Sequence, residues 1–190
     1  MIYGKAASGL EVKFCRFEKG VALDAAGVIS GYASLFGAAD QGGDVVQKGA
    51  YSASLARLKA NKRGIKMLWQ HDPAQPIGIW EDVHEDKNGL FVRGRFLGEV
   101  QKGQEAMALV KAGAIDGLSI GYRTIRAEKD VKGLRLLHEL ELWEVSLVTF
   151  PMLPEARVLG KADAEADGLV HDMATAFAEA RTLLADFNQR

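Results

Sequence analysis

The chain has 190 residues, which is enough for one domain with a sizeable core, and its formal net charge is −1 at pH 7. A near-neutral charge gives no electrostatic footprint for nucleic acid or an anionic membrane surface. The single cysteine, Cys15, excludes an internal disulfide and a cysteine-rich zinc site. No apolar run approaches the ~20 residues of a membrane span, and the amino terminus lacks a signal-peptide core. We expect a soluble protein that stays inside the cell that makes it.

Most of the chain up to residue 150 predicts short strands with two helices between them. Alternating or β-branched segments predict strands at 11–17, 27–36, 65–72, 90–97, 117–128 and 134–150. Apolar residues at helical spacing predict helices at 50–62 and 100–113, the second ending at Gly113. Asn88-Gly89 predicts a hairpin, and Pro73 predicts a loop. This order favours a mainly β fold with flanking helices (α+β), built as a closed or nearly closed antiparallel barrel that covers its own strand edges.

Pro151 and Pro154 end the predicted β region, and the pattern of the sequence changes from Ala164 onward. Leu169, Met173, Phe177 and Leu184 recur at helical spacing among charged residues, which predicts an amphipathic helix of about 20 residues. The preceding segment, "VLGKADAEADG", is small and polar. We therefore expect a β-barrel domain at 1–158, and a linker with a carboxy-terminal helix at 159–190.

The segment "GAIDGLSIGY" contains Gly117-Leu118-Ser119-Ile120-Gly121, which matches the G-x-S-x-G pattern of a hydrolase nucleophile elbow. An elbow needs a helix after the serine, with the acid and the histidine later in the chain. Here a strand, a turn and a second strand follow, which disfavours an α/β-hydrolase esterase. As a strand residue, Ser119 shares one face with Gly117 and Gly121, and the opposite face is apolar. The two glycines leave room for a substrate backbone, or they only relieve crowding at a barrel corner.

A serine nucleophile needs a base and a group that orients the base. His71, in "MLWQHDP", lies where an apolar strand gives way to a loop, a better position for a base than those of His84, His138 or His171. In "HELELWEVSLV", strict alternation places Glu144 on a nearly apolar face, where a carboxylate requires a partner. A surface ion pair remains the competing explanation.

Four segments together resemble the prohead maturation protease family of tailed bacteriophages. They are "GYASLFGAADQGGDVVQKGAY", "MLWQHDPAQPIGIW", "GAIDGLSIGY" and "ELELWEVSLVTFPMLPEA", and they span about residues 31–156. Similar proteases occur in phage-derived gene transfer agents, so a gene transfer agent is a second possible source of this sequence. The family resembles the herpesvirus assemblins, which implies a closed antiparallel barrel of about seven strands.

The resemblance implies a serine endopeptidase with a Ser-His-Glu triad: Ser119 as nucleophile, His71 as general base and acid, and Glu144 as the orienting carboxylate, with Glu141 as fallback. Oxyanion donors are expected near Pro151 to Pro154. Because proline has no N–H, Met152 and Leu153 are the candidates. No metal or organic cofactor is implied.

The implied substrates are the scaffold segment of the major capsid protein precursor and the protease's own tail, cut inside the procapsid within the bacterial host cytoplasm. We expect autoproteolysis between Leu159 and Asp167. The terminal helix would bind the capsid precursor, pair with a second copy in a homodimer, or pack on the barrel. A competing hypothesis is a non-catalytic internal scaffold with the same barrel.

Overall fold

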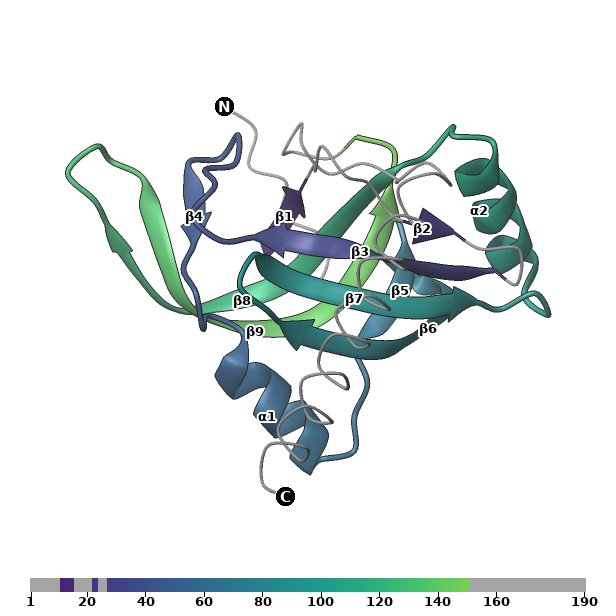
Figure 1. Ribbon diagram of the computed structural model, residues 1–190, viewed down its shortest axis with the longest axis horizontal. Helices are drawn as coiled ribbons and strands as arrows, with labels where there is room; N and C mark the ends of the chain where they lie inside the picture. The colour runs from purple at the N-terminus through teal and green to yellow at the C-terminus, as the bar shows by residue number, and fades with distance from the viewer. Residues whose placement is uncertain (1–10, 16–21, 24–26, 151–190) are drawn as a thin grey trace, which may run out of the picture.

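The computed structural model describes residues 11–15, 22–23 and 27–150 (Figure 1). The predicted boundary near residue 158, the terminal helix and the predicted autoproteolytic segment lie outside these residues. Within them, the strands are β1 (Glu11–Cys15), β2 (Ala22–Leu23), β3 (Val28–Leu35), β4 (Asp44–Val46), β5 (Lys66–Trp69), β6 (Asp72–Glu85), β7 (Gly89–Phe96), β8 (Gly117–Lys129) and β9 (Arg135–Val148). The two helices are α1 (Ser52–Ala60) and α2 (Gln101–Lys111).

All nine strands belong to one strongly curled sheet, with the order β1-β8-β9-β5-β6-β7-β3-β2 and β4 alongside β9. The pairs β4–β9 and β5–β9 are parallel, and the others are antiparallel. In the described part of the chain no ladder joins β1 to β2 or β3, so the sheet is an open half-barrel. The prediction of mainly β structure with helices is confirmed. The prediction of a closed, antiparallel barrel of about seven strands is wrong, because the parallel pairings arise from crossovers that local sequence patterns do not reveal.

The longest hairpin, β8–β9, supplies one wall of the core and extends away from it as an arm at the left of Figure 1. Along β8, Leu118, Ile120 and Tyr122 are buried in the core, as the alternation predicts. Along β9 the alternation is interrupted, because Gly121 pairs with Glu144 while Tyr122 pairs with Leu142.

Trp143 is therefore the extra residue of a β-bulge, and the bulge exchanges the two faces of β9. Before it, Leu140 and Leu142 face the core; after it, Val145 and Leu147 do. The prediction that strict alternation places Glu144 on the nearly apolar face, which here is the face of Leu140 and Leu142, is wrong for this reason. Glu144 and Ser146 lie on the opposite face.

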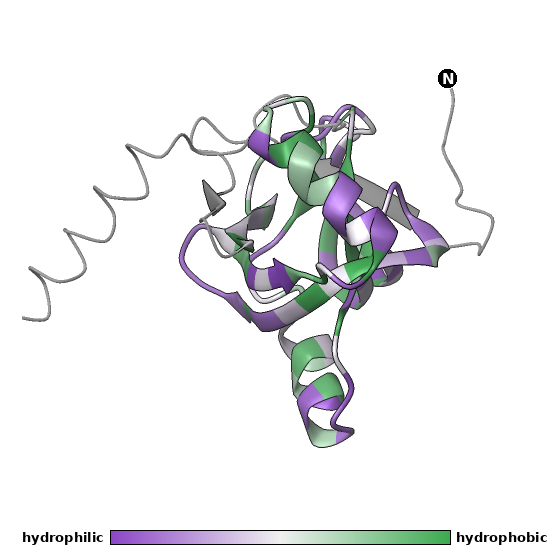
Figure 2. Cartoon of the chain, turned by 90° about the vertical axis from the view of Figure 1, so that its right-hand side faces the viewer, coloured by the Kyte–Doolittle hydropathy of each residue, from purple (hydrophilic) through white to green (hydrophobic). Residues whose placement is uncertain are grey.

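The helices pack on the curled sheet from two ends, with α1 at the lower end and α2 at the upper right in Figure 1. Leu55 and Leu58 of α1 pack against the core, as do Ala106 and Val110 of α2. Gly113 follows the end of α2 with φ +70°, which is the left-handed conformation that stops a helix. Figure 2 shows α1 projecting from the body of the sheet with hydrophobic residues beside hydrophilic ones. Among the described residues, no helix is both long enough and apolar enough to span a bilayer.

Candidate active site

The turn between β5 and β6 consists of two residues, Gln70 and His71, because Trp69 pairs with Asp72. Both residues have positive φ, 51° and 61°. A two-residue hairpin with positive φ at both central positions is the type I′ arrangement, which normally selects Asn or Gly. For other residues each left-handed position costs ~1 kcal/mol or more, so contacts elsewhere must hold this turn. The predicted loop at Pro73 is wrong, because Pro73 already belongs to β6.

Strand β9 and the residues just after it supply those contacts, because β9 runs parallel to β5 and ends beside the turn. The N–H of Gln70 donates to the Leu147 carbonyl at 2.9 Å. The N–H of His71 donates to Ser146 Oγ at 3.2 Å. The Gln70 side-chain amide donates to Thr149 Oγ1 at 2.7 Å. The position of His71 is thus fixed by β9 rather than by the preferences of the turn residues themselves.

The imidazole of His71 contacts the Glu144 carboxylate, with 2.5 Å between Nδ1 and Oε1. Both side chains are largely buried, with 12% of the His71 side chain and 7% of the Glu144 side chain exposed. A carboxylate only accepts hydrogen bonds, so Nδ1 carries the donated proton. In the neutral ring, Nε2 then carries the lone pair, as a general base requires.

Ser146 is a residue of this site that the sequence reasoning did not single out. Its hydroxyl donates to the other Glu144 oxygen, Oε2, at 2.6 Å while accepting the His71 N–H. Each oxygen of the buried carboxylate therefore has a hydrogen-bond donor, which offsets the cost of burying its charge. The signal in the sequence was the spacing Glu144-x-Ser146, which places both side chains on one face of the strand.

Gly121 makes room for Glu144. A Cβ built at Gly121 would lie 2.1 Å from Glu144 Oε1 and 2.9 Å from its Cγ, far inside van der Waals contact. The space left by this glycine is therefore filled by the Glu144 side chain, which replaces the prediction that Gly121 leaves room for a substrate. Gly117 is buried and pairs with Val148 at the other end of the segment.

Ser119 lies on β8 directly opposite Ser146, two residue pairs along from Gly121 and Glu144. Directly opposed residues in an antiparallel pair share a face of the sheet. Ser119 is therefore in the same layer of side chains as Glu144 and Ser146, opposite the core face. Both serines are fully buried.

The other predicted site residues lie apart from this cluster or outside the described residues. Glu141 precedes the bulge, where its carboxylate forms an ion pair with Arg123 at 2.6 Å. Met152 and Leu153, the predicted oxyanion donors, lie outside the described residues. Among the residues that the structure describes, no group of three or more His, Cys, Asp or Glu is arranged to hold a metal ion.

A buried carboxylate–imidazole pair, with a serine in the same layer of side chains, contains the kinds of group that serine hydrolases use. Comparison with known proteins narrows this class. Residues 16–167 match the family described as Caudovirus prohead serine protease, and the chain belongs to that family.

Three relatives are similar in sequence. The prohead protease of Enterobacteria phage HK97 is 27% identical over 150 residues, covering 77% of this chain and 65% of the relative. The prohead protease of Escherichia phage T5 is 32% identical over 115 residues, covering 59% and 52%. The capsid polyprotein of Pseudomonas phage PAJU2 is 33% identical over 163 residues, covering 81% and 22%. The chain thus spans between about half and two thirds of the length of the two prohead proteases.

One solved structure is similar in fold. The bacteriophage T4 capsid assembly protease, gp21, superposes with a TM-score of 0.58 at 20% identity, covering 75% of this chain and 98% of that one. The half-barrel described above is therefore a fold already found in a capsid assembly protease.

Proposed function

We propose that this chain is a serine endopeptidase of procapsid maturation, with Ser119 as nucleophile, His71 as general base and acid, and Glu144 as the orienting carboxylate. The observation that carries the proposal is the 2.5 Å contact between His71 Nδ1 and Glu144 Oε1 in the side-chain layer that contains Ser119. Family membership supports the reaction class. Glu144 is preferred over Glu141 because Glu141 lies before the bulge and pairs with Arg123.

The reaction is acyl transfer. Nε2 of His71 removes the Ser119 proton as the oxygen attacks a peptide carbonyl, and the same nitrogen then protonates the leaving amine. In the second half-reaction, Nε2 removes a proton from water as the water oxygen attacks the acyl carbonyl. It then gives that proton to the Ser119 oxygen as the ester bond breaks and the acid product leaves. Glu144 stabilises the imidazolium between these steps without taking its proton. Ser119 is fully buried, so a peptide substrate reaches its hydroxyl only if the surrounding structure moves.

The tetrahedral oxyanion requires backbone N–H donors beside Ser119. Among residues 151–154, which follow β9, Met152 and Leu153 carry the N–H groups that Pro151 and Pro154 lack. They remain the proposed donors. Side chains of this chain alone carry the proton in each of these steps.

The substrates we propose are the scaffold segment of a major capsid protein precursor and the chain's own tail, cut between Leu159 and Asp167. The names of the relatives support this proposal, since two are prohead proteases and one is a capsid polyprotein. The place of action is then the interior of the procapsid in the host cell.

Co-expression with the capsid precursor tests the proposal. The precursor is expected to shorten with the wild-type chain and to remain intact with Ser119→Ala. Ser34→Ala is the matched control, because Ser34 is also a fully buried strand serine. Equal shortening with Ser119→Ala would remove Ser119 from the mechanism, and co-purification without shortening by any variant would favour an internal scaffold.

A further inference from the structure

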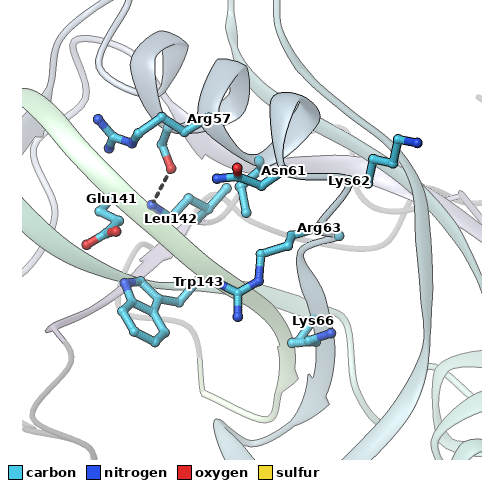
Figure 3. Close-up of a pocket in the computed structure, with 11 residues that line it drawn as sticks. Arg57, Asn61, Lys62, Arg63, Lys66, Glu141, Leu142 and Trp143 are labelled. Carbon is cyan, nitrogen blue, oxygen red and sulfur yellow. Dashed lines mark hydrogen bonds between the residues drawn. The ribbon is translucent and has the colours of Figure 1, made fainter.

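A basic cavity lies between α1, the loop after it and β9, with a volume of about 500 Å³ (Figure 3). We call it the basic pocket. Four cationic side chains line it, together with one carboxylate, that of Glu141, and the indole of Trp143; the cations are Arg57, Lys62, Arg63 and Lys66. Figure 3 shows Arg63 reaching toward Trp143 with Lys66 beside it, whereas the head groups of Arg57 and Lys62 point away. Arg63 and Lys66 are therefore the cations at the sheet end of the pocket.

The charges of the basic pocket are not balanced within it. In the part of the chain that the structure describes, Lys62, Arg63 and Lys66 form no ion pair. The pocket's carboxylate, Glu141, already pairs with Arg123. The carboxyl end of α1 attracts Lys62 and Arg63 through the helix dipole, but Lys66 lies on β5 beyond its reach. The pocket therefore suits an anionic ligand.

The cavity on the other side of α1 differs in charge. It has a volume of about 770 Å³, and three carboxylates line it, those of Glu81, Asp82 and Glu85. Lys59 lines it too, and it shares Arg63 with the basic pocket. Mixed charges give no preference for an anion there, so the anionic ligand is specific to the β9 side of α1.

The basic pocket adjoins the proposed active site on two strands. Trp143, whose residue is 50% exposed, directly precedes Glu144 at the bulge. Lys66 is the register partner of Glu144 on β5. The β5–β9 ladder begins at this pair. Upstream of it, the N–H groups of Leu140 and Leu142 donate to the Ala50 carbonyl and Ser54 Oγ of the α1 region, and Ser54 and Leu142 line the basic pocket. A peptide that contacts Trp143 there lies one residue from Glu144, the proposed orienting carboxylate.

We propose that the basic pocket binds residues 162–180 of the same molecule and so holds the chain's tail beside the active site. This segment contains five carboxylates, and neither Lys nor Arg; the acids are Asp163, Glu165, Asp167, Asp172 and Glu179. It also contains Leu169, Met173 and Phe177, which are apolar partners for Trp143. The acids of this segment thus match the cations of the basic pocket, and its apolar side chains match Trp143.

The connecting chain is long enough. The 12 residue-to-residue steps from Phe150 to Ala162 span up to ~40 Å when the chain is extended. A domain of about 125 residues has a radius of gyration of about 14 Å. The tail of one molecule therefore reaches its own basic pocket without a second copy.

Zero-length carbodiimide cross-linking of the full-length Ser119→Ala chain tests the docking without any cleavage. This reagent joins a lysine amine to a carboxylate only where the two are in contact. We expect amides from Lys66 or Lys62 to acids of the 162–180 segment, lost at high salt because exposed charge pairs are screened. Lys87, exposed on the β6–β7 hairpin, is the control. Equal cross-linking to Lys87, no amide at the pocket, or amides only between isotopically distinct copies would overturn the proposal.

Exchanging the charges of the basic pocket and of the tail tests whether docking speeds self-cleavage. This test rests on the proposed function, because it requires the chain to be a protease. Arg63→Glu with Lys66→Glu is expected to slow self-cleavage ~10-fold, a size typical of two exposed charge pairs. Adding Asp172→Lys and Glu179→Lys, which lie outside the predicted cut, is expected to restore the rate, and Lys87→Glu to leave it unchanged. No rescue would contradict docking by charge. Cross-links without self-cleavage would refute the proposed function alone, and self-cleavage without cross-links would refute the docking alone.

Discussion

Two tight turns of the same sheet follow opposite rules. The β6–β7 turn contains Asn88-Gly89, the dipeptide most typical of left-handed hairpin turns, yet neither residue has a positive φ. The β5–β6 turn contains Gln70-His71, which have little preference for that conformation, yet both adopt it. The left-handed conformation, which Asn-Gly would adopt at little cost, is thus found at Gln70 and His71 instead.

The two turns differ in what holds them. At β6–β7 the Asp86 carboxylate accepts hydrogen bonds from the N–H groups of Asn88 and Gly89, so the turn is held largely by its own residues. At β5–β6 the contacts come from Leu147, Ser146 and Glu144, more than 70 positions away. The strained backbone of such a turn is destabilising by itself, but contacts from distant residues fix the position of its side chain. This combination is typical of functional sites.

The largest expected effect comes from removing the charge that holds His71. Glu144→Gln keeps the shape of the side chain but no longer stabilises an imidazolium, and its amide can favour the wrong tautomer. We expect kcat to fall ~10³–10⁴-fold with the fold retained, as for the orienting acid of other triads. Cleavage kinetics on a capsid-precursor peptide, with circular dichroism for the fold, measure this effect.

Glu141→Gln and Glu139→Gln are the comparisons on the same strand. Both residues are partly exposed and lie before the bulge at Trp143. We expect each to change kcat less than ~3-fold, because a partly exposed ion pair contributes little. A larger loss from Glu141→Gln than from Glu144→Gln would make Glu141 the orienting acid.

Gly121→Ala is expected to have the next largest effect, because it displaces the carboxylate without removing it. The added methyl would occupy space within 2.1 Å of Glu144 Oε1, so the side chain must move away from His71. We expect a loss of ~10²-fold in kcat and a destabilisation of about 1–3 kcal/mol. Gly98→Ala is the control, since a Cβ there meets nothing within 4 Å. Wild-type kinetics in Gly121→Ala would show that the position of the Glu144 side chain beside Gly121 is not required for activity.

The face of Ser119 could be predicted from the sequence because residues 117–122 of β8 alternate without interruption. The face of Glu144 could not, since the bulge at Trp143 shifts the register by one residue and nothing in "LELWEVSL" marks it. Glu144 was predicted from the family resemblance, and the burial argument that accompanied it used the wrong face. The β8 alternation is local, whereas the bulge depends on how β8 and β9 pair.

The rest of the fold shows the same division. Helices α1 and α2 and the β6–β7 hairpin follow from local patterns, and all three are present. The parallel pairing of β5 with β9 joins residues almost 80 positions apart, and this pairing brings the His71 turn to Glu144. Sequence patterns identified the candidate residues, but only the long-range pairing brings them together.

Ser146→Ala tests the hydroxyl that connects the turn to the carboxylate. It removes the donor to Glu144 Oε2 and the acceptor of the His71 N–H, leaving the strained turn with fewer contacts. We expect kcat to fall ~10–100-fold with KM unchanged, because a positioning residue does not bind substrate. The NMR signal of the His71 Nδ1 proton is expected to shift.

Ser34→Ala provides the contrast for Ser146→Ala. Ser34 is equally buried, and its Oγ has no hydrogen-bond partner among the described residues, so its loss costs no interaction. We expect unchanged kinetics and equal or higher stability. If both alanine variants lower kcat alike, the effect of Ser146 is one of packing rather than of positioning.

The smallest expected effect is at the self-contained turn, with Asp86→Asn. Burial raises the pKa of the Asp86 carboxyl. Hydrogen bonds from the Tyr32 hydroxyl and from the N–H groups of Gly89 and Asn88 lower it by more, so the pKa lies below its ordinary value of 3.8. A carboxyl whose pKa is lower in the folded than in the unfolded state stabilises the folded protein at pH values above its unfolded-state pKa. This contribution is lost as the pH falls through the folded-state pKa. We expect the wild type to exceed Asp86→Asn in unfolding free energy by about 1 kcal/mol at pH 7, with unchanged activity. In urea unfolding followed over pH, the difference should shrink as the pH falls below 3.8 and disappear below the folded-state pKa, because both side chains are then neutral. A difference that persists at low pH would show that the Asp86 turn depends on shape rather than on charge.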